Sequence, residues 1–361
     1  MSASPYMTPK QSRQRRQSAR RRRARRRAVV IGALALAIAA ALVMVAVAKS
    51  HAHRSPTATT DAPQSAHSAD AVPARSPSGL ALGDPPLALA GLDDPRTDPV
   101  QLTFHRPPRA GLLFNLDTGQ VLWQRNPDLR LPIASLTKMM TALLTVESAP
   151  PNAPVLVTRQ AVDSAGSKVG VLPLGRHVRL KTMLYGLLLP SGNDAAVALA
   201  QHVSGGVRRF VARMNAEAAK LGMACTRYSS PSGYYDAGNY SCAADLAVLA
   251  HVDLEQPRIA RIVRTYSAAL PFPIKGGRLY LYNNNPLLIY GYPGLTGLKT
   301  GYTVAAGKCL VATAERHGVR LGVVLLHSPD PGTQARRLLD SGFERVYHQA
   351  PVREPQMPAG A

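Results

Sequence analysis

The sequence predicts an α+β domain in which strands from the two ends of the domain join in one antiparallel sheet beside a cluster of helices. Apolar runs with strand character occur near residue 110 and again after residue 295. The region between them consists mainly of segments with helical patterns. Strands first, helices next and strands last favour this class over alternating βαβ units.

The elements follow in that order. The segment "AGLLFNLDTGQVLWQRN", from Ala110, has two apolar runs around the turn signal "DTG" and predicts two strands. Helices are predicted over 135–146, over 194–203 and within "SGGVRRFVARMNAEAAKLGM", where Gly222 ends the helix. Later, "TGLKTGYT" predicts a strand, "KCLVATAERHGVRLGVVLLH" a strand pair and "ARRLLDSGFERV" a closing helix.

A different kind of segment precedes this domain. Residues 1–27 hold 11 basic residues and no acidic one, and residues 28–48 then run without a charge. Such a run is long enough to cross a bilayer, and the basic block predicts a cytoplasmic N-terminus. The "AVA" at 46–48 resembles a signal-peptidase site, so cleavage stays open, although the run is longer than the usual signal core of about 7 to 15 residues. We expect an anchor in a cell membrane, or secretion after cleavage, and export of the remaining chain in both cases.

The formal net charge of +22 could also indicate a protein that binds nucleic acid. Half of that charge lies in residues 1–27, directly before the predicted span, where basic residues set the orientation of the span in the membrane. We therefore expect no nucleic-acid partner. The surplus of positive charge in the rest of the chain fits either an anionic wall or membrane surface or an ordinary solvated face.

Residues 49–108 are rich in Ser, Ala, Pro, His and Asp and show no sustained period, so we expect a disordered linker. The domain is then expected over 109–347, with a tail over 348–361. The chain has three cysteines, Cys225, Cys242 and Cys309. Cys225 and Cys242 could form a disulfide or remain free buried thiols, and the spacing of the three matches no metal site. We expect neither a metal nor a cofactor.

The stretch "PIASLTKMMTALLTVE" places Ser135 three residues before Lys138 in an apolar helix. Positions i and i+3 lie on one helix face, so the hydroxyl and the amine are within reach. Burial and nearby positive charge would lower the pKa of the lysine, and its neutral amine could then take the proton of the serine. The helix N-terminus would stabilise negative charge at Ser135. Alone, this SxxK pattern also fits a helix cap followed by a surface lysine.

Two further motifs favour chemistry. "LLLPSGNDAAVALA" contains SxN at Ser191–Asn193, and "GLKTGYT" contains KTG at Lys299–Gly301. Ser191 would relay the proton to the leaving amine, and Asn193 would hold the substrate backbone and Lys138.

The third motif would bind the substrate's other end. Lys299, on an edge strand, would supply a permanent charge for a substrate carboxylate, and Thr300 a hydroxyl hydrogen bond. Gly301 would leave room for a close approach of the ligand. The backbone N–H groups of Ser135 and Tyr302 would form an oxyanion hole.

This combination resembles penicillin-binding proteins and serine β-lactamases. More narrowly, the chain resembles the low-molecular-mass D-alanyl-D-alanine carboxypeptidases, the serine peptidase family S11. The similarity runs from about Ala110 to Val346, through "LDTGQVLWQRNPDLRLPIASLTKMMTALL", residues 184–196, "DAGNYSCAADLAVLA" and "GLKTGYTVAAGKCLVATA". It implies a β-lactamase/transpeptidase-like domain, an acyl-enzyme at Ser135, hydrolysis of the terminal D-Ala-D-Ala bond of peptidoglycan stem peptides, and inhibition by β-lactams.

The chain also departs from the family. It has "SCAADLA" at 241–247 where relatives often have "STARDLA", and "SPSGYY" at 230–235 where they have "NPHGL". These changes lie in loops expected near the site and put the substrate preference in question. We expect no C-terminal β-domain after Val346, and we expect the N-terminal anchor to attach the protein to the membrane instead.

Other activities compete with this interpretation. A class A β-lactamase needs a glutamate in an ExxLN-type sequence, and Glu217 is followed by "AAKL". A zinc peptidase is disfavoured because no HExxH occurs and His51, His53 and His67 lie in the expected linker. A D,D-endopeptidase acting on cross-links and a non-catalytic β-lactam or wall sensor remain as alternatives.

Overall fold

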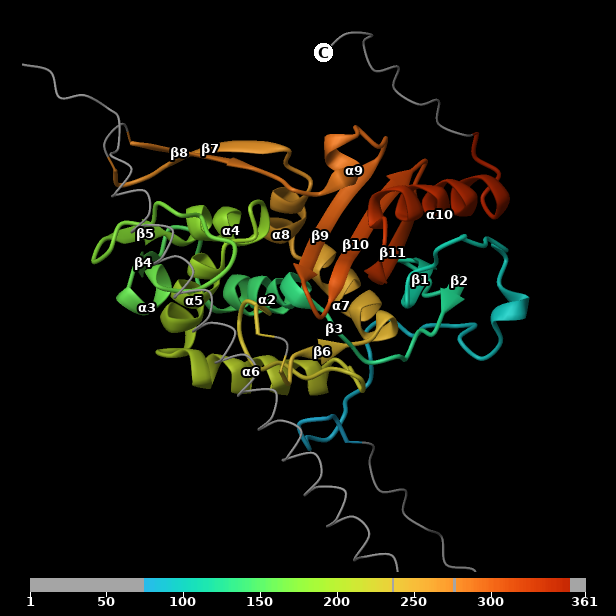
Figure 1. Ribbon diagram of the computed structural model, residues 1–361, viewed down its shortest axis with the longest axis horizontal. Coiled ribbons are helices and arrows are strands. Elements are labelled where there is room, and N and C mark those ends of the chain that lie inside the picture. The colour runs from blue at the N-terminus through green and yellow to red at the C-terminus, as the bar shows by residue number, and fades with distance from the viewer. Residues whose placement is uncertain (1–74, 236, 275–276, 351–361) are drawn as a thin grey trace, which may run out of the picture. The chain divides into compact units, whose positions relative to one another are not determined.

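The computed structural model describes residues 75–235, 237–274 and 277–350 (Figure 1). Its main sheet has five antiparallel strands in the order β2-β1-β11-β10-β9. Their bounds are β1 Ala110–Asn115, β2 Val121–Arg125, β9 Leu295–Thr303, β10 Gly307–Arg316 and β11 Val319–Ser328. β1 pairs with β11, with Ala110 opposite Leu326. The predicted α+β class, with early and late strands in one antiparallel sheet, is confirmed.

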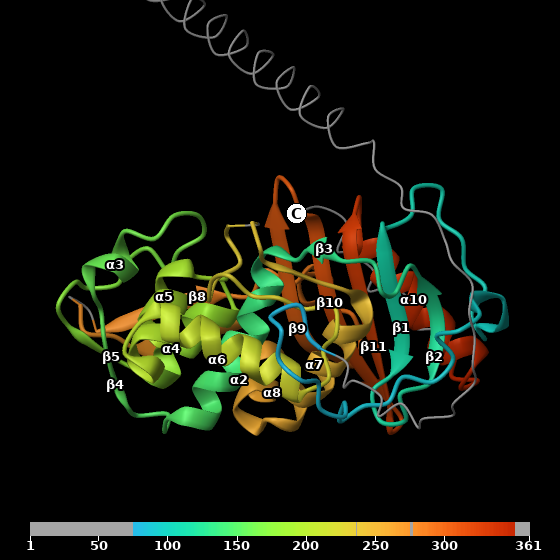
Figure 2. The same ribbon diagram turned by 90° about the horizontal axis from the view of Figure 1, so that it is seen from below.

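The sheet is covered on both faces, because successive side chains of a strand point to opposite sides. Phe114 and Val311 belong to the larger core beneath the helical cluster, whereas Leu113 and Leu310 belong to a second core beneath α10, Pro331–Arg345. Figure 2 shows α10 on the side of the sheet away from the helical cluster around α2 (Lys138–Ser148). The middle strands are therefore almost wholly apolar.

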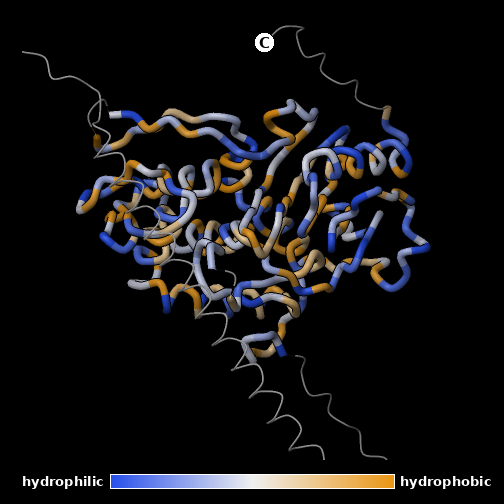
Figure 3. The backbone as a smooth tube through the Cα atoms, in the orientation of Figure 1, coloured by the Kyte–Doolittle hydropathy of each residue, from blue (hydrophilic) through white to orange (hydrophobic). Residues whose placement is uncertain are grey.

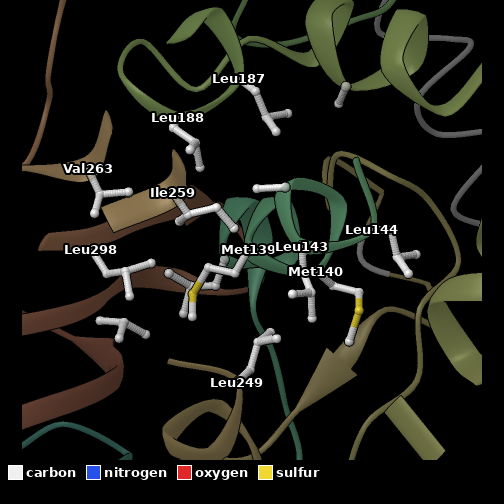
Figure 4. Packing of buried hydrophobic residues seen from close by; sticks show 14 of the residues in the cluster. Met139, Met140, Leu143, Leu144, Leu187, Leu188, Leu249, Ile259, Val263 and Leu298 are labelled. Carbon is white, nitrogen blue, oxygen red and sulfur yellow. The ribbon is translucent and has the colours of Figure 1, made fainter. Parts of the chain in front are cut away.

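The helical cluster is built around α2 (Figure 1). Its other helices are α3 Arg159–Val162, α4 Leu180–Leu188, α5 Asn193–Ser204, α6 Val207–Lys220, α7 Ala243–Glu255 and α8 Pro257–Val263. Residues 138–146 of α2 are all buried. Figure 4 shows Met139, Met140 and Leu143 of α2 packed among side chains such as Leu188 and Leu298. No side chain caps the N-terminus of α2, so burial, worth about 1.5–3 kcal/mol for each large apolar side chain, holds this helix in place.

Shorter elements complete the domain. Three two-stranded sheets pair β3 with β6, β4 with β5 and β7 with β8. Their bounds are β3 Leu131–Pro132, β4 Pro154–Leu156, β5 His177–Arg179, β6 Tyr240–Ser241, β7 Ser267–Pro271 and β8 Arg278–Tyr282. The remaining helices are the 3-10 turns η1 Pro95–Thr97 and η2 Ala134–Thr137, and α9 Pro286–Ile289.

The predicted linker does not extend to residue 108. Parts of 75–108 pack against the domain instead: the backbone N–H of Gly83 donates to the carbonyl of Ala219 in α6, and Val100 is fully buried beside the sheet. Asp98 accepts hydrogen bonds from the backbone and the side chain of Gln124, and the indole of Trp123 donates to the carbonyl of Leu102. This arm alternates between orange and blue along the tube in Figure 3. Val100, Leu102 and Phe104 alternate with polar residues and all pack into the second core, but this run is short and is flanked by Pro-containing segments, so the sequence analysis assigned it to the linker.

Cys225 and Cys242 form a disulfide that joins the loop after α6 to the residue before α7, which decides the question the sequence left open. Among the described residues, no helix has the length and apolar character needed to cross a bilayer. The predicted span over 28–48 and the basic segment over 1–27 lie outside the described residues. So do residues 49–74 of the predicted linker and 351–361 of the tail.

Candidate active site

Ser135 lies in the 3-10 turn η2, and Lys138 is the first residue of α2. In a 3-10 turn the side chains at i and i+3 eclipse each other, which stacks the lysine on the serine more directly than an α-helix would. Nζ of Lys138 lies 2.7 Å from Oγ of Ser135. The proximity predicted from the spacing is therefore present, although the turn type differs from the α-helix that we expected.

The Lys138 side chain is completely buried, and its Nζ also donates to the carbonyl oxygen of Ser232 at 2.7 Å. Burial lowers the pKa of Lys138 well below its ordinary value, and the nearby Lys299 lowers this pKa further, whereas Asp194 acts in the opposite direction. An amine in this environment favours its neutral form. Neutral Lys138 can donate to Ser232 and still offer its lone pair to the hydroxyl of Ser135.

The second motif lies between α4 and α5. Ser191 has a backbone φ of 65° and a buried Oγ that has no hydrogen-bond partner among the described residues. Asn193 donates through Nδ2 to the carbonyl of Ala165 at 2.6 Å. Contrary to the sequence-based expectation, no hydrogen bond joins Asn193 to Lys138 in the described part of the chain; the carbonyl of Ser232 has that role. A backbone carbonyl belongs to every residue, so no sequence signal identified it.

Asp194, which the sequence analysis did not single out, holds the neighbouring loop over 164–170. Its carboxylate accepts hydrogen bonds from the backbone N–H groups of Val169 at 2.9 Å and Gly170 at 3.0 Å. The N–H of Asn193 donates to the carbonyl of Ser167 at 2.7 Å. The loop is thus fixed to the second motif from both sides. The only available signal was the position of Asp194 directly after the SxN triplet.

The third motif lies on β9, which is an edge strand as predicted. Lys299 is 1% exposed and donates to the carbonyl of Thr300 at 2.9 Å. Burial lowers the pKa of Lys299 to about 7, so its charge is not permanent near neutral pH, contrary to our expectation. Thr300 donates its hydroxyl to Oδ1 of Asn284 at 2.7 Å. A substrate carboxylate would have to compete with Asn284 for this donor.

Gly301 allows β9 to approach the turn that carries the nucleophile. A Cβ at this position would lie 2.9 Å from the carbonyl oxygen of Ile133 and 3.2 Å from the backbone nitrogen of Ser135. The sequence analysis attributed the glycine to the approach of a ligand, whereas the structure shows contact with the protein's own turn. Tyr302 follows on the same strand, so its N–H and that of Ser135 belong to adjoining segments.

The three motifs meet in an open cleft of about 390 Å³. Serines from the first two motifs and residues of β9 line one part of it, and residues from the β8–α9 connection, β10 and the start of α10 line the rest. The lining residues are Ser135, Ser167, Ser191, Thr300, Gly301, Tyr302, Asn284, Pro286, Tyr290, Lys308, Cys309, Asp330, Pro331 and Gly332. The serine nucleophile candidate therefore opens onto a cleft, with two lysines buried behind it.

Comparisons with known proteins point to one family. The profile described as D-alanyl-D-alanine carboxypeptidase, Peptidase S11, matches residues 107–330. The D-alanyl-D-alanine carboxypeptidase DacF of Bacillus subtilis is 34% identical over 268 residues, which cover 72% of this chain and 67% of DacF. DacB2 of Mycobacterium tuberculosis is 38% identical over 66% of this chain and 82% of its own length.

Other relatives carry related names. A D-alanyl-D-alanine endopeptidase of Pseudomonas aeruginosa is 35% identical over 65% of this chain and 82% of its own length. A crystal structure of a D-alanyl-D-alanine carboxypeptidase from Mycobacterium tuberculosis superposes with a TM-score of 0.64 at 35% identity, covering 73% of this chain and 99% of that chain. The Streptomyces K15 DD-transpeptidase superposes with a TM-score of 0.63 at 29% identity, over 67% of this chain and 99% of that one.

Proposed function

Because this chain belongs to the S11 family of D-alanyl-D-alanine carboxypeptidases, we propose that it removes the terminal D-alanine from peptidoglycan stem peptides through an acyl-enzyme at Ser135. The observation that carries this proposal is the contact between Nζ of Lys138 and Oγ of Ser135 at 2.7 Å. A buried lysine with a lowered pKa beside a serine that opens onto a cleft is the arrangement of an activated nucleophile.

The steps follow from these positions. Neutral Lys138 takes the proton of Ser135 while Oγ attacks the carbonyl carbon of the penultimate D-alanine. The N–H groups of Ser135 and Tyr302 stabilise the oxyanion. Ser191, whose buried hydroxyl has no hydrogen-bond partner among the described residues, passes the proton to the departing amine, and D-alanine leaves. Water then hydrolyses the ester and restores Ser135.

Lys299 and Thr300 bind the terminal carboxylate of the substrate in this proposal. A carboxylate beside a buried lysine stabilises the ammonium form, so substrate binding raises the pKa of Lys299 from its value in the free protein. Thr300 exchanges its hydrogen bond to Asn284 for one to the substrate. β-Lactams carry the same carboxylate and acylate Ser135 as inhibitors.

Hydrolysis of a cross-link is the second candidate, because relatives of similar identity carry the names carboxypeptidase and endopeptidase. Digestion of a defined pentapeptide and of a cross-linked dimer, followed by mass analysis, separates the two. We expect D-alanine from the pentapeptide as the main product. Rapid penicillin turnover would instead indicate a β-lactamase, and binding without any product would indicate a sensor.

We further propose that the enzyme acts outside the bacterial cytoplasm, held at the membrane by residues 28–48. The uncharged run behind an arginine-rich segment supports this location, as does the Cys225–Cys242 disulfide, since such bonds persist in oxidising compartments. The full chain should stay in membranes after a carbonate wash. A soluble form that begins at Lys49 would show cleavage and secretion instead.

A further inference from the structure

The hairpin formed by β7 and β8 carries an aromatic face that the proposed chemistry does not use. Along β8, Leu279 and Leu281 are buried, whereas Tyr280 and Tyr282 are both 63% exposed. Ser267 and Ala269 of β7, which are exposed as well, lie opposite Tyr282 and Tyr280. The leucines hold the hairpin on the domain, so the tyrosines are not needed for that purpose.

This face is suited to a flat, apolar ligand surface. Tyr280 and Tyr282 are two residues apart on one face of a strand, which places them about 7 Å from each other. Their cross-strand neighbours Ala269 and Ser267 are small, so no bulky side chain faces the rings from β7, and Arg278 follows on the same face of β8. No acidic residue occurs in 265–285. We call Tyr280, Tyr282, Ala269 and Ser267 the tyrosine face.

The tyrosine face continues into the active-site cleft. Asn284, two residues after Tyr282, lines the cleft and accepts the hydroxyl hydrogen bond of Thr300. The backbone N–H of Asn284 donates to the carbonyl of Leu189, just before the second motif. The base of the hairpin is therefore connected to the third motif and to the segment just before the second. Figure 1 shows the hairpin extending from the side of α4 toward α9 and β9.

We propose that the tyrosine face binds the glycan chain of peptidoglycan while the stem peptide occupies the cleft. The proposal rests on the proposed function, which makes a peptide attached to a glycan the substrate. Sugar rings present apolar C–H faces that pack against aromatic rings, and the tyrosine hydroxyls can hydrogen-bond the sugar substituents. A ligand that enters the cleft by its peptide end has its glycan outside the cleft, and the hairpin that carries this face is one of the segments that border the cleft, through Asn284.

The test uses the full chain in detergent and glycan strands that an amidase has freed of stem peptides and that are coupled to beads for sedimentation. Cosedimentation should show binding by the wild type and roughly tenfold weaker binding by Tyr280→Ser/Tyr282→Ser, as expected for the loss of two aromatic contacts of about 0.7 kcal/mol each. Tyr280→Phe/Tyr282→Phe should retain most of the binding, because it keeps the rings. Leu156→Ser, which removes an exposed apolar side chain from the separate two-stranded sheet of β4 and β5, should bind like the wild type.

A second readout compares D-alanine release from intact peptidoglycan with release from a free pentapeptide. The serine double variant should lose about tenfold on intact peptidoglycan relative to the free peptide. Equal glycan binding by the double variant and the wild type would overturn the proposal, as would weaker binding to lipid vesicles with unchanged glycan binding. If the wild type releases D-alanine from neither substrate, the proposed function fails, while the cosedimentation result still decides whether the face binds glycan.

Discussion

The carbonyl oxygen of Ser232 accepts a hydrogen bond from Nζ of Lys138 at 2.7 Å. A neutral amine has one lone pair, so this bond turns the lone pair of Lys138 toward other neighbours, of which Oγ of Ser135 lies at 2.7 Å. The loop that contains Ser232 thus helps to set the direction of proton transfer. This loop contains the stretch "SPSGYY" at 230–235.

Gly233 fixes this loop against the nucleophile turn and provides a first prediction. Its φ is 71°, and a Cβ there would collide with the carbonyl of Ala134. Gly233→Ala should slow acylation of Ser135 by a β-lactam at least tenfold and destabilise the fold by about 1–3 kcal/mol, since backbone must move. Gly238→Ala is the matched control, because Gly238 has a φ of 72° and its nearest neighbour would be 3.7 Å from a Cβ. Equal acylation rates in both variants would contradict the role given to the loop.

A second prediction concerns the nucleophile and its base. Fluorescent penicillin should label the wild-type chain covalently and should not label Ser135→Ala. Lys138→Ala should label about 10²- to 10⁴-fold more slowly, which is the usual contribution of general-base help. Labelling rates measured by in-gel fluorescence test both statements. Normal labelling of Ser135→Ala would exclude the proposed nucleophile, and an unchanged rate for Lys138→Ala would exclude the base.

The sequence predicted the elements whose signals are periodic or local. The strands around Ala110 and Lys299 follow apolar runs, and the contact between Ser135 and Lys138 follows from a spacing of three. It did not reveal contacts made by backbone groups, such as the carbonyl of Ser232, because these groups have no residue-type signature. It also missed the packing of Val100, because the short alternating run over 100–104 is flanked by Pro-containing segments that are typical of a linker. Long-range register, which places Gly301 against the nucleophile turn, is set by tertiary packing and not by local pattern.

Lys299 provides a third prediction. If its ammonium binds the substrate carboxylate, Lys299→Gln should reduce kcat/KM for a carboxylate substrate roughly 30-fold. This corresponds to a loss of about 2 kcal/mol of transition-state stabilisation, which is the usual contribution of a hydrogen bond between charged groups. A substrate with an amidated C-terminus lacks the charge and should show a much smaller difference between the two proteins. Parallel kinetics with the two substrates measure this. Equal losses would remove the carboxylate-binding role.

The pH dependence provides a fourth prediction. Because burial lowers the pKa of Lys299 to about 7 in the free protein, its ammonium is lost as the pH rises through that value. kcat/KM reports ionisations of the free enzyme, so its value for a carboxylate substrate should fall above about pH 7. The amidated substrate does not need the ammonium and should not show this decrease. A decrease at the same pH for both substrates would assign it to another group.

Asp194 provides the last prediction, because its carboxylate has two separable effects. It accepts the N–H groups of Val169 and Gly170, which hold the loop over 164–170 beside the cleft. Its charge also raises the pKa of Lys138, against the larger effect of burial. In Asp194→Asn an NH₂ group replaces one oxygen, so one backbone N–H loses its acceptor, at a cost of about 1.5–3 kcal/mol.

The two effects of Asp194→Asn have different signatures. Loosening of the loop should lower the acylation rate at every pH. Loss of the negative charge should lower the pKa of Lys138 further, so that its neutral form persists to lower pH and the acidic limb of the acylation profile moves to lower pH. Asp163→Asn is the control, because Asp163 lies just before the same loop, its side chain is 62% exposed, and its ion-pair partner is Arg159. A slower acylation rate with an unchanged acidic limb would show that Asp194 holds the loop but does not affect the pKa of Lys138. An unchanged acylation rate would show that the loop does not position the site.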